Sequence, residues 1–108
     1  MSRELQNLSI GQTATTTRQT LFTVGVGEVV APALVLTNAS ANVIEVSVYV
    51  SNGLTDFLIE ARKIPAGIGK IFSVLSLSTQ KLNAGFSVKI QTTTADPINH
   101  HLSGSVIT

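Results

Sequence analysis

The sequence predicts an all-β fold, built as a two-sheet antiparallel β-sandwich or a jelly-roll-like barrel of about seven strands. Three observations predict it. Apolar residues alternate with polar ones at the period of two that half-buried strands require. Turn-forming residues separate these segments at intervals of roughly 8–14 residues. The segments are rich in Val, Ile and Thr, whose branched side chains favour strands. Because one sheet alone would leave an apolar face in water, we expect a second sheet to cover it.

The clearest strand is the segment 43–51, in which every second residue from Ile44 to Val50 is apolar and Glu45, Ser47 and Tyr49 face the other way. Pro32 lies inside another expected strand and cannot donate to a ladder, so it indicates an edge, a bulge or a strand start. The remaining strands are expected at residues 13–24, 29–37, 56–64, 69–77, 86–92 and 100–108.

Two turns built on Ala-Gly, at Ala66-Gly67 and Ala84-Gly85, each stand beside an alternating segment. Asn52-Gly53 is a tight-turn signal between two strands. Gly25-Val26-Gly27 lacks the third glycine and the following helix of a phosphate-binding loop, so we interpret it as a turn.

Residues 1–12 differ from the β-sandwich domain expected over residues 13–108. They alternate poorly, and the spacing of Leu5 and Leu8 suits one helical turn in a segment too short to be helical alone. We expect an extended N-terminal arm that becomes ordered only against a neighbour.

Composition restricts the classes of function. Hydrophobic residues make up 44% of the 108 residues and charged residues only 12%, so Thr, Ser and Asn supply most of the polar surface. Such a surface suits a protein whose faces are covered by other proteins, and the alternative is a Thr-rich monomer. The net charge is +1 with no basic stripe, which disfavours nucleic-acid binding.

Other features argue against membranes, thiolate sites and export. There is no Cys, hence no disulfide or thiolate metal site. The apolar run 29–36 contains Pro32 and is shorter than the ~20 residues that span a bilayer. The first residues have no apolar signal-peptide region, so we expect the chain to stay in a cytoplasm or to leave by lysis.

The residues that could carry chemistry form no recognisable set. The adjacent His100 and His101 would point to opposite faces of a strand and could not share a metal. Glu60 and Arg62 are expected to form a solvated surface pair. We therefore expect no catalytic residue, no metal and no cofactor. Among the aromatic residues, Tyr49 alternates onto a polar face and suits an interface, a sugar or a base, while three others fit core positions: Phe22, Phe57 and Phe86.

The order of segments resembles that of small all-β virion structural proteins of tailed bacteriophages, over roughly residues 18–108. The residues that carry the resemblance are Thr20-Leu21-Phe22-Thr23-Val24, Leu34-Val35-Leu36-Thr37-Asn38, Val46-Ser47-Val48-Tyr49-Val50, Ile64-Pro65-Ala66-Gly67 and Leu82-Asn83-Ala84-Gly85-Phe86-Ser87-Val88-Lys89-Ile90. Phe86 stands where the pattern usually has an acidic residue. The motifs are structural turns, and the family has no catalytic residues to transfer.

The resemblance implies a non-enzymatic capsid decoration (cement) protein that binds the outer shell of a virion and stabilises it. Its expected partners are the major capsid protein or other virion proteins and further copies of itself, as a trimer or dimer, with neither nucleic acid nor membrane. Its expected location is the virion, assembled in the host cytoplasm. The alternatives are a neck or tail component and a carbohydrate-binding module that uses Tyr49. The candidate interface residues are Arg3, Leu5, Leu8 and Tyr49.

Overall fold

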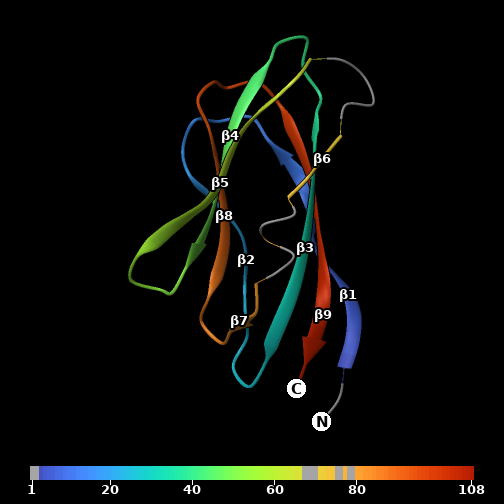
Figure 1. Cartoon of the computed structure of the whole chain (residues 1–108), viewed down its shortest axis with the longest axis vertical. Helices are drawn as coiled ribbons and strands as arrows, with labels where there is room; N and C mark the ends of the chain where they lie inside the picture. Colours follow the sequence, from blue (N-terminus) through green and yellow to red (C-terminus); the bar gives the residue numbers. More distant parts are fainter. Residues whose placement is uncertain (1–2, 67–70, 75–76, 78–79) are drawn as a thin grey trace.

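The computed structural model describes residues 3–66, 71–74, 77 and 80–108, and within them nine strands form two antiparallel sheets (Figure 1). The strands are β1 (Arg3–Thr13), β2 (Gln19–Thr23), β3 (Val29–Asn38), β4 (Ile44–Ser51), β5 (Asp56–Ile64), β6 (Ile71–Ser73), β7 (Leu82–Asn83), β8 (Ser87–Thr92) and β9 (Ile98–Ile107).

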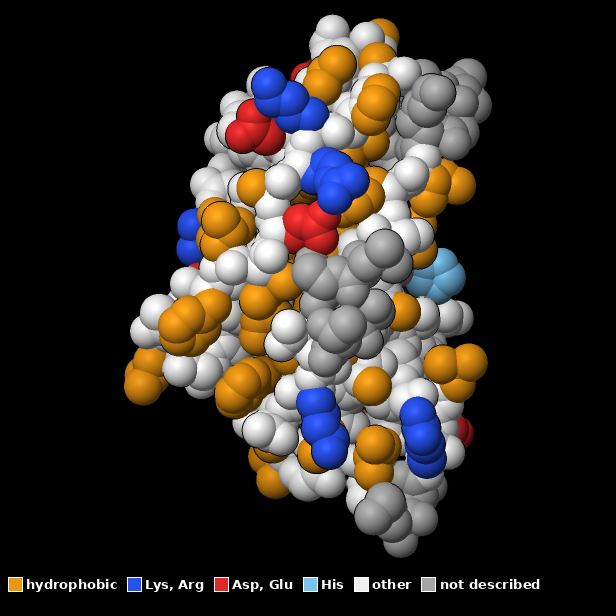
Figure 2. Space-filling model, in the orientation of Figure 1, with side chains coloured by type: hydrophobic (Ala, Val, Ile, Leu, Met, Phe, Trp, Pro, Cys, Tyr) orange, Lys and Arg blue, Asp and Glu red, His pale blue; other side chains and the backbone are white. Residues whose placement is uncertain are grey.

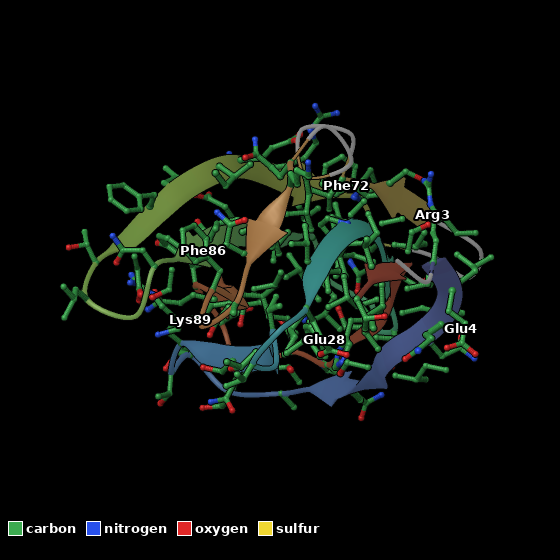
Figure 3. All side chains as sticks on the ribbon, turned by 90° about the horizontal axis from the view of Figure 1, so that it is seen from below. Arg3, Glu4, Glu28, Phe72, Phe86 and Lys89 are labelled. Carbon is green, nitrogen blue, oxygen red and sulfur yellow. The ribbon has the colours of Figure 1, made fainter. Side chains whose placement is uncertain are left out.

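Sheet A has the order β1-β9-β3-β6, with the short β7 also paired to β3, and sheet B has the order β2-β8-β4-β5. In Figure 1 sheet A lies on the right and sheet B on the left. Figure 3 shows the same two layers from below, with Arg3 and Glu4 on the side of sheet A and Lys89 on the side of sheet B. The predicted two-sheet antiparallel sandwich is confirmed.

The core lies between the sheets and is almost wholly aliphatic. The alternation predicted for residues 43–51 is confirmed, because Ile44, Val46, Val48 and Val50 are buried. Each such side chain contributes roughly 1.5–3 kcal/mol through its removal from water. The largest fully buried residues are Leu34, Leu36, Ile44, Ile64, Leu77, Leu82, Ile90, Ile98 and Leu102.

Three of the predicted turns have a glycine with positive φ, namely Gly27, Gly53 and Gly85. Gly85 has φ 86°, and the amide of Phe86 donates to the carbonyl oxygen of Asn83 at 3.0 Å, as in a type II turn. Gly27 has φ 78° in the turn after Gly25. The first Ala-Gly turn, at Gly67, lies outside the described residues, as does part of the strand expected at 69–77, of which β6 is described.

The segment expected to be an N-terminal arm is extended and pairs with its own chain. From Arg3 onward this segment is β1, the edge strand of sheet A. It pairs antiparallel with β9, from Arg3 opposite Ile107 to Thr13 opposite Ile98. Leu8 lies at a bulge and packs against the core, and beyond the bulge Ile10 faces outward. The strand expected at 13–24 is divided as a result: Thr13 ends β1, and the chain re-enters the fold in sheet B as β2.

A second bulge, between Glu60 and Leu58 on β5, changes which of its side chains face inward. Glu60 pairs with Val48 and Arg62 with Val46, so both lie on the inner face of sheet B at its edge. The predicted pair of Arg62 and Glu60 forms there at 3.0 Å, but it is not fully solvated as expected, because only 17% of the Glu60 side chain is exposed. The core position predicted for Phe57 is wrong. The end of the β4–β5 hairpin bends away from sheet A (Figure 1), and Phe57 near this end is 51% exposed.

Candidate functional site

The first candidate surface is the outer face of sheet A, which points away from the core. The register aligns Leu5, Ser105 and Ala31 in one row, and Ile10, His101 and Val35 in another. We define the outer face of sheet A by the residues Arg3, Leu5, Asn7, Ile10, Gln12, Val29, Ala31, Ala33, Val35, Thr37, Ile71, Ser73, Asn99, His101, Ser103, Ser105 and Ile107.

This face is almost without charge. Of the residues that define it, Arg3 alone is fully charged at neutral pH, and it lies at the start of β1. The outer face of sheet B is different, because the cross-strand pair of Glu45 and Lys63 and the residues Asp56 and Lys89 all lie there. The charged residues of the two outer faces therefore lie mostly on sheet B, and the outer face of sheet A is nearly uncharged.

The second candidate surface is the apolar hairpin tip, formed by Leu54, Phe57 and Leu58 at the end of the β4–β5 hairpin. All three are exposed, Leu54 to 95%. In Figure 2 hydrophobic side chains gather on this projection at the lower left, on the side of the molecule opposite sheet A. Exposed apolar side chains grouped on a projection are typical of a protein interaction site.

The outer face of sheet B holds a network of charges around Tyr49. The guanidinium carbon of Arg18 lies 3.8 Å from the centre of the Tyr49 ring. The Arg18 Nη1 donates to Asp56 at 2.9 Å, and the Lys89 Nζ lies 3.1 Å from the same carboxylate. Hydrogen bonds from Arg18, Ser51 and Lys89 lower the pKa of Asp56 from 3.8 to about 2.

A shallow depression lies beside Tyr49. It has a volume of about 480 Å³ and its other lining residues are polar: Thr16, Ser47, Gln91, Thr92 and Thr93. Since Arg18 covers one face of the ring, the aromatic surface that a sugar would stack on is already occupied there.

The structure separates the four interface residues predicted from the sequence. Arg3 and Leu5 lie on the outer face of sheet A. Leu8 packs against the core, and Tyr49 lies on the opposite sheet. The apolar hairpin tip was not predicted from the sequence. The available signal was Leu54, a large apolar residue placed directly after the Asn52-Gly53 turn.

The two histidines point to opposite faces of β9, as predicted. His100 is buried, with its Nε2 2.9 Å from the Ser9 Oγ, whereas the exposed His101 contacts Asn7 at 3.0 Å. Burial lowers the pKa of His100. Within the described ranges no group of three or more His, Cys, Asp or Glu residues could hold a metal ion. The same ranges contain no helix long and apolar enough to cross a bilayer.

The fold and these surfaces define a β-sandwich protein with one nearly uncharged sheet face and an exposed apolar hairpin tip. No family model matches the chain, and no curated protein matches it. Among solved structures, the Drosophila NLP core, described for pentamer formation and histone binding, superposes with a TM-score of 0.50 at 14% identity over 100% of both chains.

A chain of the T13 particle of infectious bursal disease virus superposes with a TM-score of 0.52 at 13% identity. The match covers 96% of this chain and 30% of the viral one, so the chain spans less than a third of that neighbour. At such identities the likeness shows the fold alone, which this chain shares with a chain of a viral particle.

Proposed function

We propose that the chain is a non-enzymatic structural protein of a tailed-phage virion, a capsid decoration protein that binds the outer shell and stabilises it. The major capsid protein is its proposed partner on the shell. The observation that carries the proposal is the apolar hairpin tip, in which Leu54, Phe57 and Leu58 are exposed on a two-stranded projection. A decoration protein adds buried area to a shell, and such a tip offers apolar area without large ordering cost.

Two further observations support the proposal. The turn sequences resemble those of small virion proteins, and the sandwich fold is also found in a viral capsid chain. The low charge of sheet A fits a protein that is covered on more than one side within an assembly.

The hairpin tip can be tested by attachment to particles assembled without the chain. We expect wild-type protein to sediment with such particles and Leu54→Asp to remain in the supernatant, because a buried unpaired carboxylate is costly. Val26→Asp is the matched control, since Val26 is also a fully exposed apolar residue but lies in the β2–β3 turn. Equal sedimentation of Leu54→Asp and Val26→Asp would argue against the tip as the contact.

A neck or tail component remains the nearest alternative, because a rigid sandwich with apolar projections suits a ring as well as a shell. The two differ in copy number. A shell protein is present in hundreds of copies per particle, whereas a neck or tail ring contains only the few copies that the symmetry of the ring requires. Quantitative mass spectrometry of purified particles distinguishes them.

The polar depression beside Tyr49 favours a second candidate function, carbohydrate binding on a host-recognition fibre. This function needs the ring of Tyr49, so Tyr49→Ala should abolish any glycan binding that the wild type has. A glycan array without hits, or binding by Tyr49→Ala at the level of the wild type, would rule it out.

A further inference from the structure

Small and large side chains lie on different strands of the outer face of sheet A. Its centre is lined by small residues, Ala31 and Ala33 on β3 and Ser103 and Ser105 on β9. On the neighbouring edge strand β1, Leu5 and Ile10 stand out, with 80% and 67% of their surface exposed. Because the four small side chains are shorter than Leu5 and Ile10, we call them the trough, and we call Leu5 and Ile10 the β1 ridge.

We infer that this face is the interface of a two-fold dimer of the chain, in which the β1 ridge of each copy lies in the trough of the other. A two-fold interface uses the same patch on both partners and must therefore be self-complementary. A patch that carries both a ridge and a trough meets this requirement. The inference rests on the proposed function, because it names the surface through which the decoration protein forms its homo-oligomer.

The charge of the face also fits a second copy better than another partner. Two outer faces of sheet A bring no like charges together at their centre, and Arg3 lies at a strand end, where it reaches the rim. A strongly charged partner would find no complementary charge on this face, and it would lose solvation on binding.

The area of the face is close to what a stable dimer needs. Three strands of about ten residues and the short β6 give a flat footprint of roughly 500 Å², from ~3.3 Å per residue and ~4.8 Å between strands. The ridge and trough raise the accessible area above this footprint. Specific complexes begin at about 600 Å² per partner.

The dimer also leaves the proposed shell contact free. The apolar hairpin tip lies on the side of the sandwich opposite sheet A (Figure 1). Face-to-face packing of two A sheets would therefore place the two tips at opposite ends of the dimer, so the dimer contact buries neither tip.

Sedimentation velocity of the purified chain tests the inference. We expect wild-type protein to sediment at twice the chain mass of 11.3 kDa, and Ala33→Glu to sediment as a single copy, because it places two carboxylates in the contact. Ala61→Glu is the matched control. Ala61 is also an exposed alanine on a strand, but it faces outward from sheet B, so this variant should remain dimeric.

A cysteine variant covers the case in which Ala33→Glu fails to fold. The chain has no Cys, so Ser103→Cys near the two-fold axis should form a disulfide-linked dimer on mild oxidation, whereas Ala61→Cys should not. A monomeric wild type, a ring of three or five copies, or equal cross-linking of the two cysteine variants overturns the inference. These measurements use the purified chain without particles. Failure of the dimer inference is therefore distinguishable from failure of the proposed function, which the particle experiments test separately.

Discussion

The guanidinium group of Arg18 lies over the ring of Tyr49, with 3.8 Å between its central carbon and the ring centre. Arg18 ends the segment that carries the chain from β1 to β2, and Tyr49 is in the middle of β4. The same guanidinium donates to Asp56, so one side chain fastens the crossing segment to two strands of sheet B. Tyr49 lies on the polar outer face of sheet B, and the Arg18 guanidinium covers part of its ring. Tyr49 is therefore half-buried instead of exposed.

Removal of Arg18 should expose the Tyr49 ring. The chain has one Tyr and no Trp, so its intrinsic fluorescence reports on Tyr49 alone. We expect Arg18→Ala to raise the acrylamide quenching constant of the folded protein. Arg62→Ala, which removes a guanidinium placed over Phe72, is the control and should leave the constant unchanged. Equal quenching of wild type and Arg18→Ala would show that Arg18 does not cover the ring in solution.

Asp56 should make the fold sensitive to acid. Its pKa is about 2 in the folded chain and has an ordinary value of 3.8, because Arg18, Ser51 and Lys89 donate to the ionised form. Between these values the unfolded chain binds more protons, so the stabilisation is present above pH 3.8 and is lost as the pH falls toward 2. Urea unfolding of the wild type and Asp56→Asn should differ most at neutral pH and converge near pH 2. A difference that is constant across this range would contradict the ion-pair network.

Leu8 and Leu5 lie on the same strand and should differ in their effect on stability. Leu8 packs against the core, so Leu8→Ala should lower the free energy of unfolding by about 1–2 kcal/mol. Leu5 is exposed, so Leu5→Ala should change the stability of the single chain by less than about 0.5 kcal/mol. Both values come from urea unfolding in dilute solution. Equal effects would show that β1 does not pair with β9 in the described register.

Gly104 should not tolerate a side chain. A Cβ there would meet the Ala31 carbonyl oxygen at 2.7 Å and the Pro32 Cα at 3.2 Å. Since these are backbone atoms, Gly104→Ala should cost about 1–3 kcal/mol of folding free energy. Ser105→Ala, one residue further along β9 and facing outward, serves as the control and should be nearly neutral. The check is the shift of the unfolding midpoint in urea.

Regular alternation made most of the sandwich predictable from the sequence. In β4 the burial follows the pattern residue by residue, and Tyr49 lies on the face that its position indicated. The bulges could not be predicted in this way, because one extra residue reverses the faces beyond it. With strict alternation Leu8 and Ile10 would share a face, but the bulge at Leu8 sends Ile10 outward.

The candidate surfaces were less predictable, because they depend on which segments lie beside each other. The sequence indicated a protein with few charges, and only the pairing of β1, β9 and β3 shows that the uncharged residues share one face. The exposure of Phe57 depends on a hairpin whose end bends away from the opposing sheet. No local sequence pattern indicates where one sheet diverges from the other.

The most direct test of the proposed function is the location of the chain in the particle. Electron cryomicroscopy of purified virions, compared with particles assembled without the chain, should show extra density with the size of this sandwich at regular positions over the outer shell. Density at the neck or tail alone would contradict the capsid position, and particles without any copy of the chain would contradict the virion function altogether.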